Sequence, residues 1–364
     1  MKTITSSNKK IKIFLGAYVN STNAQNLNCL ALAQHLDKGL FEVFTLKVYS
    51  GNLKIPAMLG VNMFTCFNPH RISKYMGYLW GIYKCDIAYL PKGEIYTWNS
   101  FWIKLFKRKS FSTVEGILDE VAIDNAINTL GNYEKVISSY NQFDKLYSIT
   151  NYLNHYNYKQ HSIKTEVKTL YLGTNISAFL NEELHVTSLR NVLIIGNELI
   201  RKGVYDFFEI SKKFPSISFF VVGSGNGKIN INQVIEDEGY KNVTYLNSLN
   251  STELSNQLKR MDLHILPSRS EGFPKVTLET AAAGVPSLVY SDYGANEWIT
   301  HNQDGFVVDT LEQMIETVMQ LKNNPDLLKQ NSVNAIALAK RFDWGILIKD
   351  WEQEIVKLHH KECQ

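Results

Sequence analysis

The stretch that decides the fold, residues 268–286, reads SRSEGFPKVTLETAAAGVP. The apolar run Asp262 to Leu266 precedes it, and the run Pro286 to Tyr290 follows it. This order predicts a strand, a loop, a short helix and a second strand. Pro274 suits the first position of the helix, because proline has no N–H to leave unpaired there, and Gly284 suits the residue that ends it.

The start of this helix is suited to an anion. Lys275 and Val276 contribute N–H groups without an acceptor inside the helix, and the helix dipole favours phosphate at the same end. Glu271 precedes the helix and Glu279 lies inside it, and eight helical positions would span about 12 Å. Carboxylates accept hydrogen bonds from pairs of sugar hydroxyls. The pattern predicts a ligand with a sugar, a diphosphate and a ribose, whereas two glutamates at this spacing alone are typical of a solvated surface.

The stretch resembles the signature of the retaining GT-B glycosyltransferases of the group-1, glycogen-synthase-like family, S-x-x-E-G-F-x-x-x-x-x-E-A-x-A-x-G-x-P. Thr280 stands where the family usually has alanine. The resemblance implies an α/β chain of two Rossmann-like domains whose parallel sheets face each other across a cleft. It also implies that Glu271 contacts the transferred sugar and that Glu279 contacts the ribose hydroxyls. The residues between them that it assigns to donor binding are Gly272, Phe273, Pro274, Lys275 and Val276.

Strands and helices alternate along both halves of the chain, which predicts parallel sheets. The strands expected in the first half are residues 12–19, 41–48, 86–90, 110–114, 145–149 and 167–172. The second half restarts with strands at 191–196, 217–222 and 243–246. The boundary is expected near residue 176. By the resemblance, residues 1–176 form an acceptor-binding domain, completed by a C-terminal helix at 345–364, and residues 177–344 bind the nucleotide sugar.

Two basic residues, Arg201 and Lys202, precede the first helix-forming run of the second half. A cationic position before a helix suits a diphosphate, although a charged surface loop is the alternative. The family motif here is G-R-L-x-x-x-K-G, and this chain reads GNELIRKG at 196–203. Lys202 keeps the place of the family lysine, Asn197 replaces the arginine, and Arg201 could restore its charge from another direction. The loop with Asn247 is where relatives hold the base.

Glu115 follows the strand expected at 110–114, where the family often has a histidine near the transferring sugar. Its carboxylate either binds a sugar or acceptor hydroxyl or is merely solvated, and both interpretations stay open. The glycine-rich run 223–227 has the spacing G-x-G-x-G and no suitable helix after it, so we interpret it as a turn and not as a dinucleotide site. The sequence has no Asp-x-Asp pair, so we expect neither a metal nor a cofactor beyond the donor.

These residues predict a metal-independent hexosyltransferase that acts on a nucleotide diphosphate sugar, with UDP as the commonest family choice. The departing diphosphate needs positive charge, for which Lys202 and Arg201 are placed. The candidate catalytic residues are Glu271, Lys202 and Glu115. Two alternatives keep the fold: a nucleotide-sugar epimerase or phosphorylase, and a nucleotide-sugar-binding subunit inactivated by the changes at Asn197 and Glu115.

Composition bears on where the protein works. The four cysteines, Cys29, Cys66, Cys85 and Cys363, are far apart and form no Cys-x-x-Cys pair, which suits a reducing compartment. The apolar run 11–19 is too short to span a membrane. Residues 1–176 contain 20 Lys and Arg against 11 Asp and Glu.

Residues 98–109 mix aromatic with basic side chains, as interfacial helices do, although a helix packed on the sheet is the alternative. We expect a cytoplasmic protein that touches the anionic inner membrane face through 98–109. We expect it to extend a surface glycan, such as lipopolysaccharide or capsule, on a glycan or lipid-linked acceptor. No nucleic-acid partner is expected.

Overall fold

The computed structural model describes residues 9–91, 98–181 and 187–360, which fall into two units, each considered by itself. Unit 1 is Met1–Ile149, Leu153–Leu172 and Trp344–Gln364, and unit 2 is Thr150–Tyr152 and Gly173–Asp343. The chain therefore changes units after Leu172, four residues before the boundary expected at 176. The short segment Thr150–Tyr152 groups with unit 2, because Glu297 accepts hydrogen bonds from the backbone N–H groups of Asn151 (2.8 Å) and Tyr152.

Unit 1 is built on six parallel strands in the order β3-β2-β1-β4-β5-β6. The strands are β1 (Ile11–Tyr18), β2 (Phe41–Val48), β3 (Val61–Cys66), β4 (Ile87–Tyr89), β5 (Lys109–Val114) and β6 (Lys145–Ser148). The helices are α1 (Ala24–His35), α2 (His70–Lys84), α3 (Trp98–Leu105), α4 (Glu120–Leu130), α5 (Tyr133–Tyr140), α6 (Asn151–His161) and α13 (Trp344–His360). The central strands β1 and β2 are buried along most of their length, as expected for a sheet covered on both faces.

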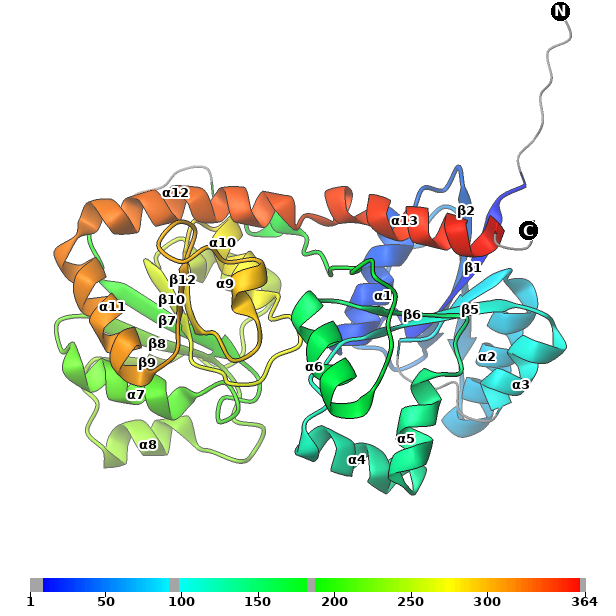
Figure 1. Ribbon diagram of the computed structural model, residues 1–364. Helices are drawn as coiled ribbons and strands as arrows, with labels where there is room; N and C mark the ends of the chain where they lie inside the picture. Colours follow the sequence, from blue (N-terminus) through cyan, green and yellow to red (C-terminus); the bar gives the residue numbers. More distant parts are fainter. Residues whose placement is uncertain (1–8, 92–97, 182–186, 361–364) are drawn as a thin grey trace, which may run out of the picture. The chain divides into compact units, whose positions relative to one another are not determined.

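Unit 2 repeats the design, with strand order β12-β11-β10-β7-β8-β9. Its strands are β7 (Asn191–Gly196), β8 (Ser218–Gly223), β9 (Val243–Tyr245), β10 (Leu263–Leu266), β11 (Ser287–Tyr290) and β12 (Phe306–Val308). Its helices are α7 (Val204–Lys213), α8 (Ile231–Asp237), α9 (Ser251–Leu258), α10 (Val276–Ala282), α11 (Leu311–Asn323) and α12 (Pro325–Arg341). Figure 1 shows α7 and α8 on one face of this sheet and α10 and α12 on the other.

In both sheets, the order in which successive strands are added reverses beside the first strand. In unit 1 the neighbours across this point are β1 and β4, and in unit 2 they are β7 and β10. Ligands of open α/β sheets bind outside the carboxyl ends of the strands at such a reversal, because the connecting loops there diverge to opposite faces and leave a crevice. The topology therefore directs attention to the loops that follow these strands.

Three expectations about local structure are wrong. Residues 167–172 form no strand: Glu166 and Leu170 each donate one backbone hydrogen bond to the β6 region, too few for a ladder. The helix expected over 98–109 ends at Leu105, because Lys107 turns the backbone to a φ of +52° and β5 follows at once. The signature helix begins at Val276, so Pro274 lies in the loop before it.

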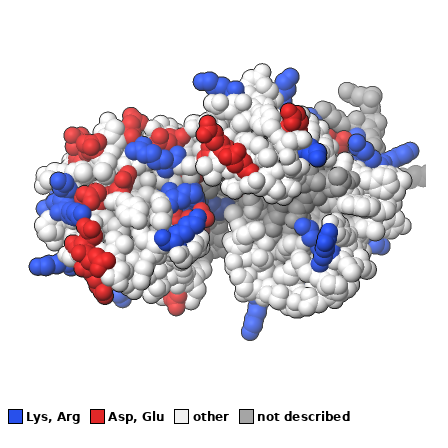
Figure 2. Space-filling view, turned by 90° about the horizontal axis from the view of Figure 1, so that it is seen from below, with Lys and Arg blue, Asp and Glu red and all other residues white. Residues whose placement is uncertain are grey.

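The surface of the two units differs in character. Figure 2 shows acidic and basic side chains closely interspersed over unit 2, at left, and wide uncharged areas over unit 1, at right. In the described part of the chain, none of the helices has the length and apolar character needed to cross a bilayer.

Helix α13 returns to unit 1 and buries two tryptophans there. The Trp351 indole is fully buried, donates its N–H to the Tyr171 carbonyl (3.0 Å) and meets the Tyr89 ring edge to face at 5.5 Å. The Glu352 carboxylate, also buried, accepts from the backbone N–H of Asp37 (2.8 Å). These contacts make the last helix part of the unit-1 core.

We expect Trp351→Ala to lower the free energy of unfolding by roughly 3–5 kcal/mol, because it leaves a cavity and an unpaired carbonyl. Ile346→Ala, at a position on the same helix that is 58% exposed, should stay within about 0.5 kcal/mol. Denaturant unfolding followed by circular dichroism compares the two. Equal losses would mean that α13 does not depend on this buried face.

Candidate functional site

Two loops of unit 2 meet at the reversal point of its sheet. One follows β7 and contains residues 197–203, and the other follows β10 and contains residues 267–275. Gly203 has a φ of +81°, and a Cβ on it would lie 2.0 Å from the Pro267 carbonyl oxygen. Only glycine permits this approach. The fully buried Ser268 hydroxyl lies 3.3 Å from the Arg201 carbonyl oxygen and 3.2 Å from that of Ser270, and so ties the loops together.

This approach brings three predicted site residues into contact. Lys202 Nζ donates to Glu271 Oε1 at 2.7 Å. Arg201 Nη1 donates to the same oxygen at 3.2 Å and to the Ser270 carbonyl at 2.7 Å. The side chains of Glu271 and Lys202 are 7% and 12% exposed, whereas that of Arg201 is 45% exposed. The buried carboxylate is therefore compensated, and the guanidinium lies where a soluble anion can reach it.

Glu198 supplies a second carboxylate to this cluster. It accepts from Arg201 Nε at 2.8 Å, and this hydrogen bond holds the pKa of the Glu198 carboxyl below its usual value. Burial lowers the pKa of the Arg201 guanidinium, but Glu271 and Glu198 more than offset that effect, so it stays charged. The cations of Arg201 and Lys202 are thus held close together by the carboxylates of Glu198 and Glu271. Asn197 is uncharged and its side chain is exposed, and the second positive charge near Glu271 comes from Arg201.

Glu279 lies in α10, and its surroundings differ from those of Glu271. Burial raises the pKa of the Glu279 carboxyl, and the nearby Lys275 ammonium opposes part of this rise. Since the helix starts at Val276, residues 271–275 are a loop, and the span of about 12 Å for eight helical positions does not apply. Val276 is the first helical residue, so its N–H has no acceptor within the helix.

The Phe273 ring does not face a ligand. It packs against the Trp298 ring at 4.9 Å and the Phe342 ring at 5.7 Å, and it is 9% exposed. Thr277 closes the same region, because its hydroxyl donates to the Pro274 carbonyl at 2.9 Å. Phe273 and Pro274, both buried, can therefore reach a donor mainly through backbone groups. Gly272, without a side chain, is restricted in the same way.

A buried row of three hydrogen-bonded side chains lies beneath α10 and accounts for a threonine at position 280. Its hydroxyl is 3.1 Å from the Ser287 hydroxyl, which in turn is 2.9 Å from His264 Nδ1. Burial, with the Lys202 charge, lowers the pKa of His264 to about 3, so its imidazole is neutral. An alanine at position 280 would remove one hydrogen-bond partner of the Ser287 hydroxyl. The three side chains link β10, α10 and β11 under the site.

The loop after β9 holds Asn247 at the same edge of the sheet. Asn247 has a φ of +55°, and its carbonyl accepts the Gly223 N–H at 2.8 Å. Its side chain is exposed. Residues 224–230 form a loop between β8 and α8, and it contains a turn at Asn226 and Gly227.

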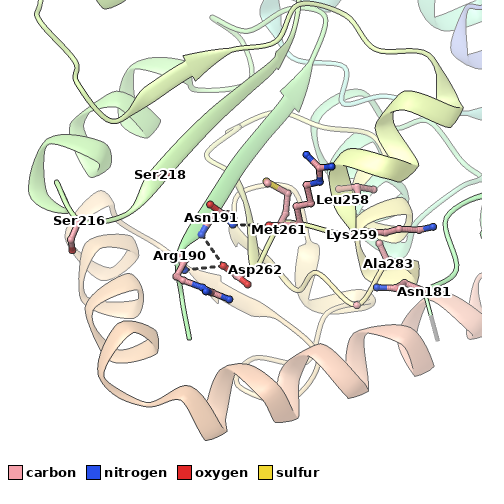
Figure 3. A pocket seen from close by; sticks show the side chains of 12 residues that line it. Asn181, Arg190, Asn191, Ser216, Ser218, Leu258, Lys259, Met261, Asp262 and Ala283 are labelled. Atoms are coloured by element: carbon pink, nitrogen blue, oxygen red, sulfur yellow. Dashed lines mark hydrogen bonds between the residues drawn. The ribbon is translucent and has the colours of Figure 1, made fainter. Parts of the chain in front are cut away.

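A hollow of unit 2 lies at the opposite end of the strands. It has a volume of about 650 Å³, and its lining includes the residues that precede β7 and β10. Figure 3 shows Asp262 accepting hydrogen bonds from the backbone of Arg190 (2.8 Å) and Asn191 (2.7 Å). Burial raises the pKa of the Asp262 carboxyl. The hollow is separate from the loops that carry Lys202 and Glu271, which follow the carboxyl ends of these strands.

Glu115 lies in unit 1, after β5, and it is not merely solvated. Its carboxylate accepts from Thr113 Oγ1 (2.9 Å), Tyr89 OH (3.2 Å) and Asn28 Nδ2 (3.1 Å). Burial raises the pKa of the Tyr89 hydroxyl well above its usual value, and Glu115 raises it further, so Tyr89 stays a donor. Glu115 and Gln25 help to line a pocket of about 300 Å³. A fixed carboxylate facing a pocket can accept hydrogen bonds from a hydroxyl-bearing ligand.

Sequence reasoning missed two members of the unit-2 site. Ser268 joins the loops and Glu198 pairs with Arg201, yet we assigned a role to neither. Ser268 is the serine of the S-x-x-E-G-F signature, and that pattern could have drawn attention to it. Nothing in the sequence indicated the partner of Glu198, because the pairing depends on how the turn 198–203 folds.

Comparisons with known proteins identify relatives of part of the chain. Residues 175–337 match the family model described as glycosyl transferases group 1. An uncharacterized glycosyltransferase of Haemophilus influenzae is 27% identical over 178 residues, 45% of this chain and 48% of that protein. The N,N'-diacetylbacillosaminyl-diphospho-undecaprenol alpha-1,3-N-acetylgalactosaminyltransferase of Campylobacter jejuni is 25% identical over 194 residues, 53% of this chain and 50% of that protein. The match thus spans about half the length of each relative.

The fold has a wider match. The structure of Anabaena HepE in complex with UDP superposes with a TM-score of 0.76 at 15% identity, covering 96% of this chain and 100% of that one. Its sequence is too distant to show more than the fold. Together with the two six-stranded parallel sheets, it shows that the chain has the two-domain α/β GT-B fold, and the family model places residues 175–337 among the group-1 glycosyltransferases.

Proposed function

We propose that this chain is a retaining glycosyltransferase that moves a hexose-type sugar from UDP to a glycan or lipid-linked acceptor in surface polysaccharide synthesis. The observation that carries the proposal is the contact of Lys202 and Arg201 with Glu271 at the carboxyl ends of β7 and β10. A diphosphate placed there would meet two cations, and a sugar joined to it would meet a carboxylate.

The chemistry required of these residues is electrostatic. The bond between the sugar C1 and the diphosphate oxygen breaks, a bond from C1 to an acceptor oxygen forms, and the acceptor proton goes to the departing diphosphate. Negative charge grows on that leaving group, and fixed cations in a partly buried site stabilise it. Lys202 and Arg201 take this role, Glu271 orients the sugar, and Glu279 binds the ribose hydroxyls.

Two observations support a glycan or lipid-linked acceptor: the name of one relative and the Glu115 pocket of unit 1. The Campylobacter protein is named for an acceptor that carries diphospho-undecaprenol, and HepE was solved with UDP. In this chain the Glu115 pocket offers a fixed carboxylate to an acceptor hydroxyl. We also propose that the protein is cytoplasmic and touches the inner membrane face through residues 98–109, and that catalysis needs no metal ion.

The direct test is product analysis after incubation with a panel of nucleotide sugars and a lipid extract. We expect a UDP sugar to be consumed only when the extract is present, with a glycosylated lipid and UDP as products, and NMR to show the donor's anomeric configuration in the product. Activity should survive a chelator, and an absolute requirement for Mg²⁺ or Mn²⁺ would contradict a metal-free site. An epimerised sugar nucleotide formed from donor alone would establish the epimerase instead. Tight nucleotide binding without any turnover would establish a binding subunit.

Lys202→Ala should lower kcat by about 10²–10³-fold, the loss seen when one fixed group that stabilises developing negative charge is removed. The matched control is Lys212→Ala, which removes a lysine of the same unit that is paired with Glu209 on the surface. Initial rates at saturating donor measure both. If Lys202→Ala stays within a few-fold of the parent, Lys202 only compensates the buried Glu271.

Glu279→Gln should act in opposite directions on binding and on stability. The nucleotide should bind about 1–3 kcal/mol more weakly, because the ribose hydroxyls lose a carboxylate acceptor. The pKa of the Glu279 carboxyl is raised in the folded state, so its ionised form destabilises the ligand-free protein once the pH exceeds the unfolded value. At neutral pH the neutral glutamine should therefore raise the free energy of unfolding, whereas at a pH below that value it should not.

Titration calorimetry and unfolding measurements at two pH values test this pair of effects. Glu316→Gln, which changes an exposed residue of α11, serves as the control and should alter neither. Unchanged nucleotide affinity in Glu279→Gln would remove Glu279 from the ribose site.

A further inference from the structure

Unit 1 exposes an unusual number of large apolar side chains on two neighbouring helices. Helices α2 and α3 pack against each other, and Figure 1 shows them side by side at the right of the molecule. Seven of their side chains are each between 48% and 59% exposed: Ile72, Tyr75, Met76, Tyr83, Trp98, Phe101 and Leu105. Scattered single apolar residues are normal on a protein surface, but a cluster of this kind marks an interaction site.

A groove runs between the two helices. It has a volume of about 440 Å³ and is lined by Arg71, Tyr75, Met76, Leu79, Trp98 and Trp102, with Asn99. Its size falls within the range of small-ligand pockets, about 300–1,000 Å³. Five of these seven side chains are apolar or aromatic, and one, Arg71, is a cation. Such a groove suits a hydrocarbon chain that ends in a negatively charged group.

The charge on the two segments that form the groove has one sign. Helix α2 and residues 98–109 together contain no Asp or Glu. They contain seven basic residues: Arg71, Lys74, Lys84, Lys104, Lys107, Arg108 and Lys109. Apolar rings beside basic groups are the composition of surfaces that lie in the interface of an anionic bilayer.

We propose that the α2–α3 surface binds an anionic lipid bilayer, with a lipid hydrocarbon chain in the groove and lipid phosphates on the surrounding cations. This extends the membrane contact proposed for 98–109 to α2 and to the groove, and it does not depend on the transferase activity. A second copy of the chain is a poorer occupant, because a symmetric contact would place the same basic residues opposite one another.

The size of the effect can be estimated from charge and from apolar burial. Each basic residue close to an anionic leaflet strengthens binding about fivefold, so replacing two should weaken it about 25-fold. Ions screen these contacts, so binding should also fall as salt rises. The apolar contribution should remain at high salt.

The experiment is sedimentation of the full-length protein with vesicles of phosphatidylcholine, alone or mixed with phosphatidylglycerol, at low and moderate salt. We expect binding only to the mixed vesicles. Lys104→Gln with Lys107→Gln should weaken it about 25-fold, and Met76→Glu with Trp98→Glu should reduce it at least tenfold. Val121→Glu, at a position of α4 that is 69% exposed, is the control and should bind like the parent.

A fluorescence measurement locates the contact. Of the described tryptophans, Trp98 is the one with a largely exposed side chain. Brominated lipids should therefore quench the parent, and Trp98→Phe should lose most of this quenching. Circular dichroism and UDP binding are measured on each variant. A variant that keeps both but fails to sediment has lost the membrane contact and not the fold or the donor site.

Three outcomes would overturn the proposal. The parent could remain in the supernatant under every condition. The α4 control could lose binding as much as the α2–α3 variants. Sedimentation velocity could reveal a dimer that Met76→Glu with Trp98→Glu abolishes, which would make this surface a contact between two copies. Transfer to a water-soluble acceptor is measured in parallel, so that failure of the membrane contact is distinguished from failure of the proposed function.

Discussion

The candidate site depends on the close approach of two backbone segments in unit 2. Gly203 stands against the Pro267 carbonyl at a distance that no Cβ could tolerate, and it adopts a left-handed conformation there. The approach sets the turn 198–203 against the loop that begins the signature. Without it, Lys202 and Arg201 would not reach the Glu271 carboxylate. The charged chemistry of the site therefore rests on an uncharged residue that provides space.

The pairing of Glu271 with Lys202 and Arg201 also stabilises the site when no ligand is bound. A carboxylate as buried as that of Glu271 is stable only when it is paired and hydrogen-bonded. Lys202 and Arg201 supply this compensation, and a diphosphate would draw on the same cations. Ligand binding would then be an exchange of partners within a site that is already assembled. The buried chain from His264 to Thr280 holds the signature helix in place beneath it, so little of the framework needs to be ordered by the ligand.

Strands were predictable because apolar β-rich runs between polar turns leave few alternatives. Phe41–Val48 and Asn191–Gly196 agree with the sequence to the residue. The failures lie where distant contacts decide. Val167 to Leu172 looks like a strand, but it meets β6 through too few hydrogen bonds, and the Val167 side chain is 96% exposed. Lys107 ends a helix that composition would continue. The sequence offered Arg201 only as one possible replacement for the family arginine. Its contact with Glu271 depends on how the turn 198–203 folds.

The family model covers one of the two units and not the other. The matched residues, 175–337, nearly coincide with unit 2, which spans Gly173–Asp343 apart from one short segment. A nucleoside diphosphate presents the same phosphates and ribose whatever sugar it carries, so one arrangement of cations and carboxylates serves many enzymes. Acceptors differ in size, charge and attachment to lipid, and the unit that receives them must differ with them. Glu115, in the place of the family histidine, lies in unit 1 and is held by three donors that suit a carboxylate. The surroundings of this position are therefore matched to a carboxylate and not only tolerant of one.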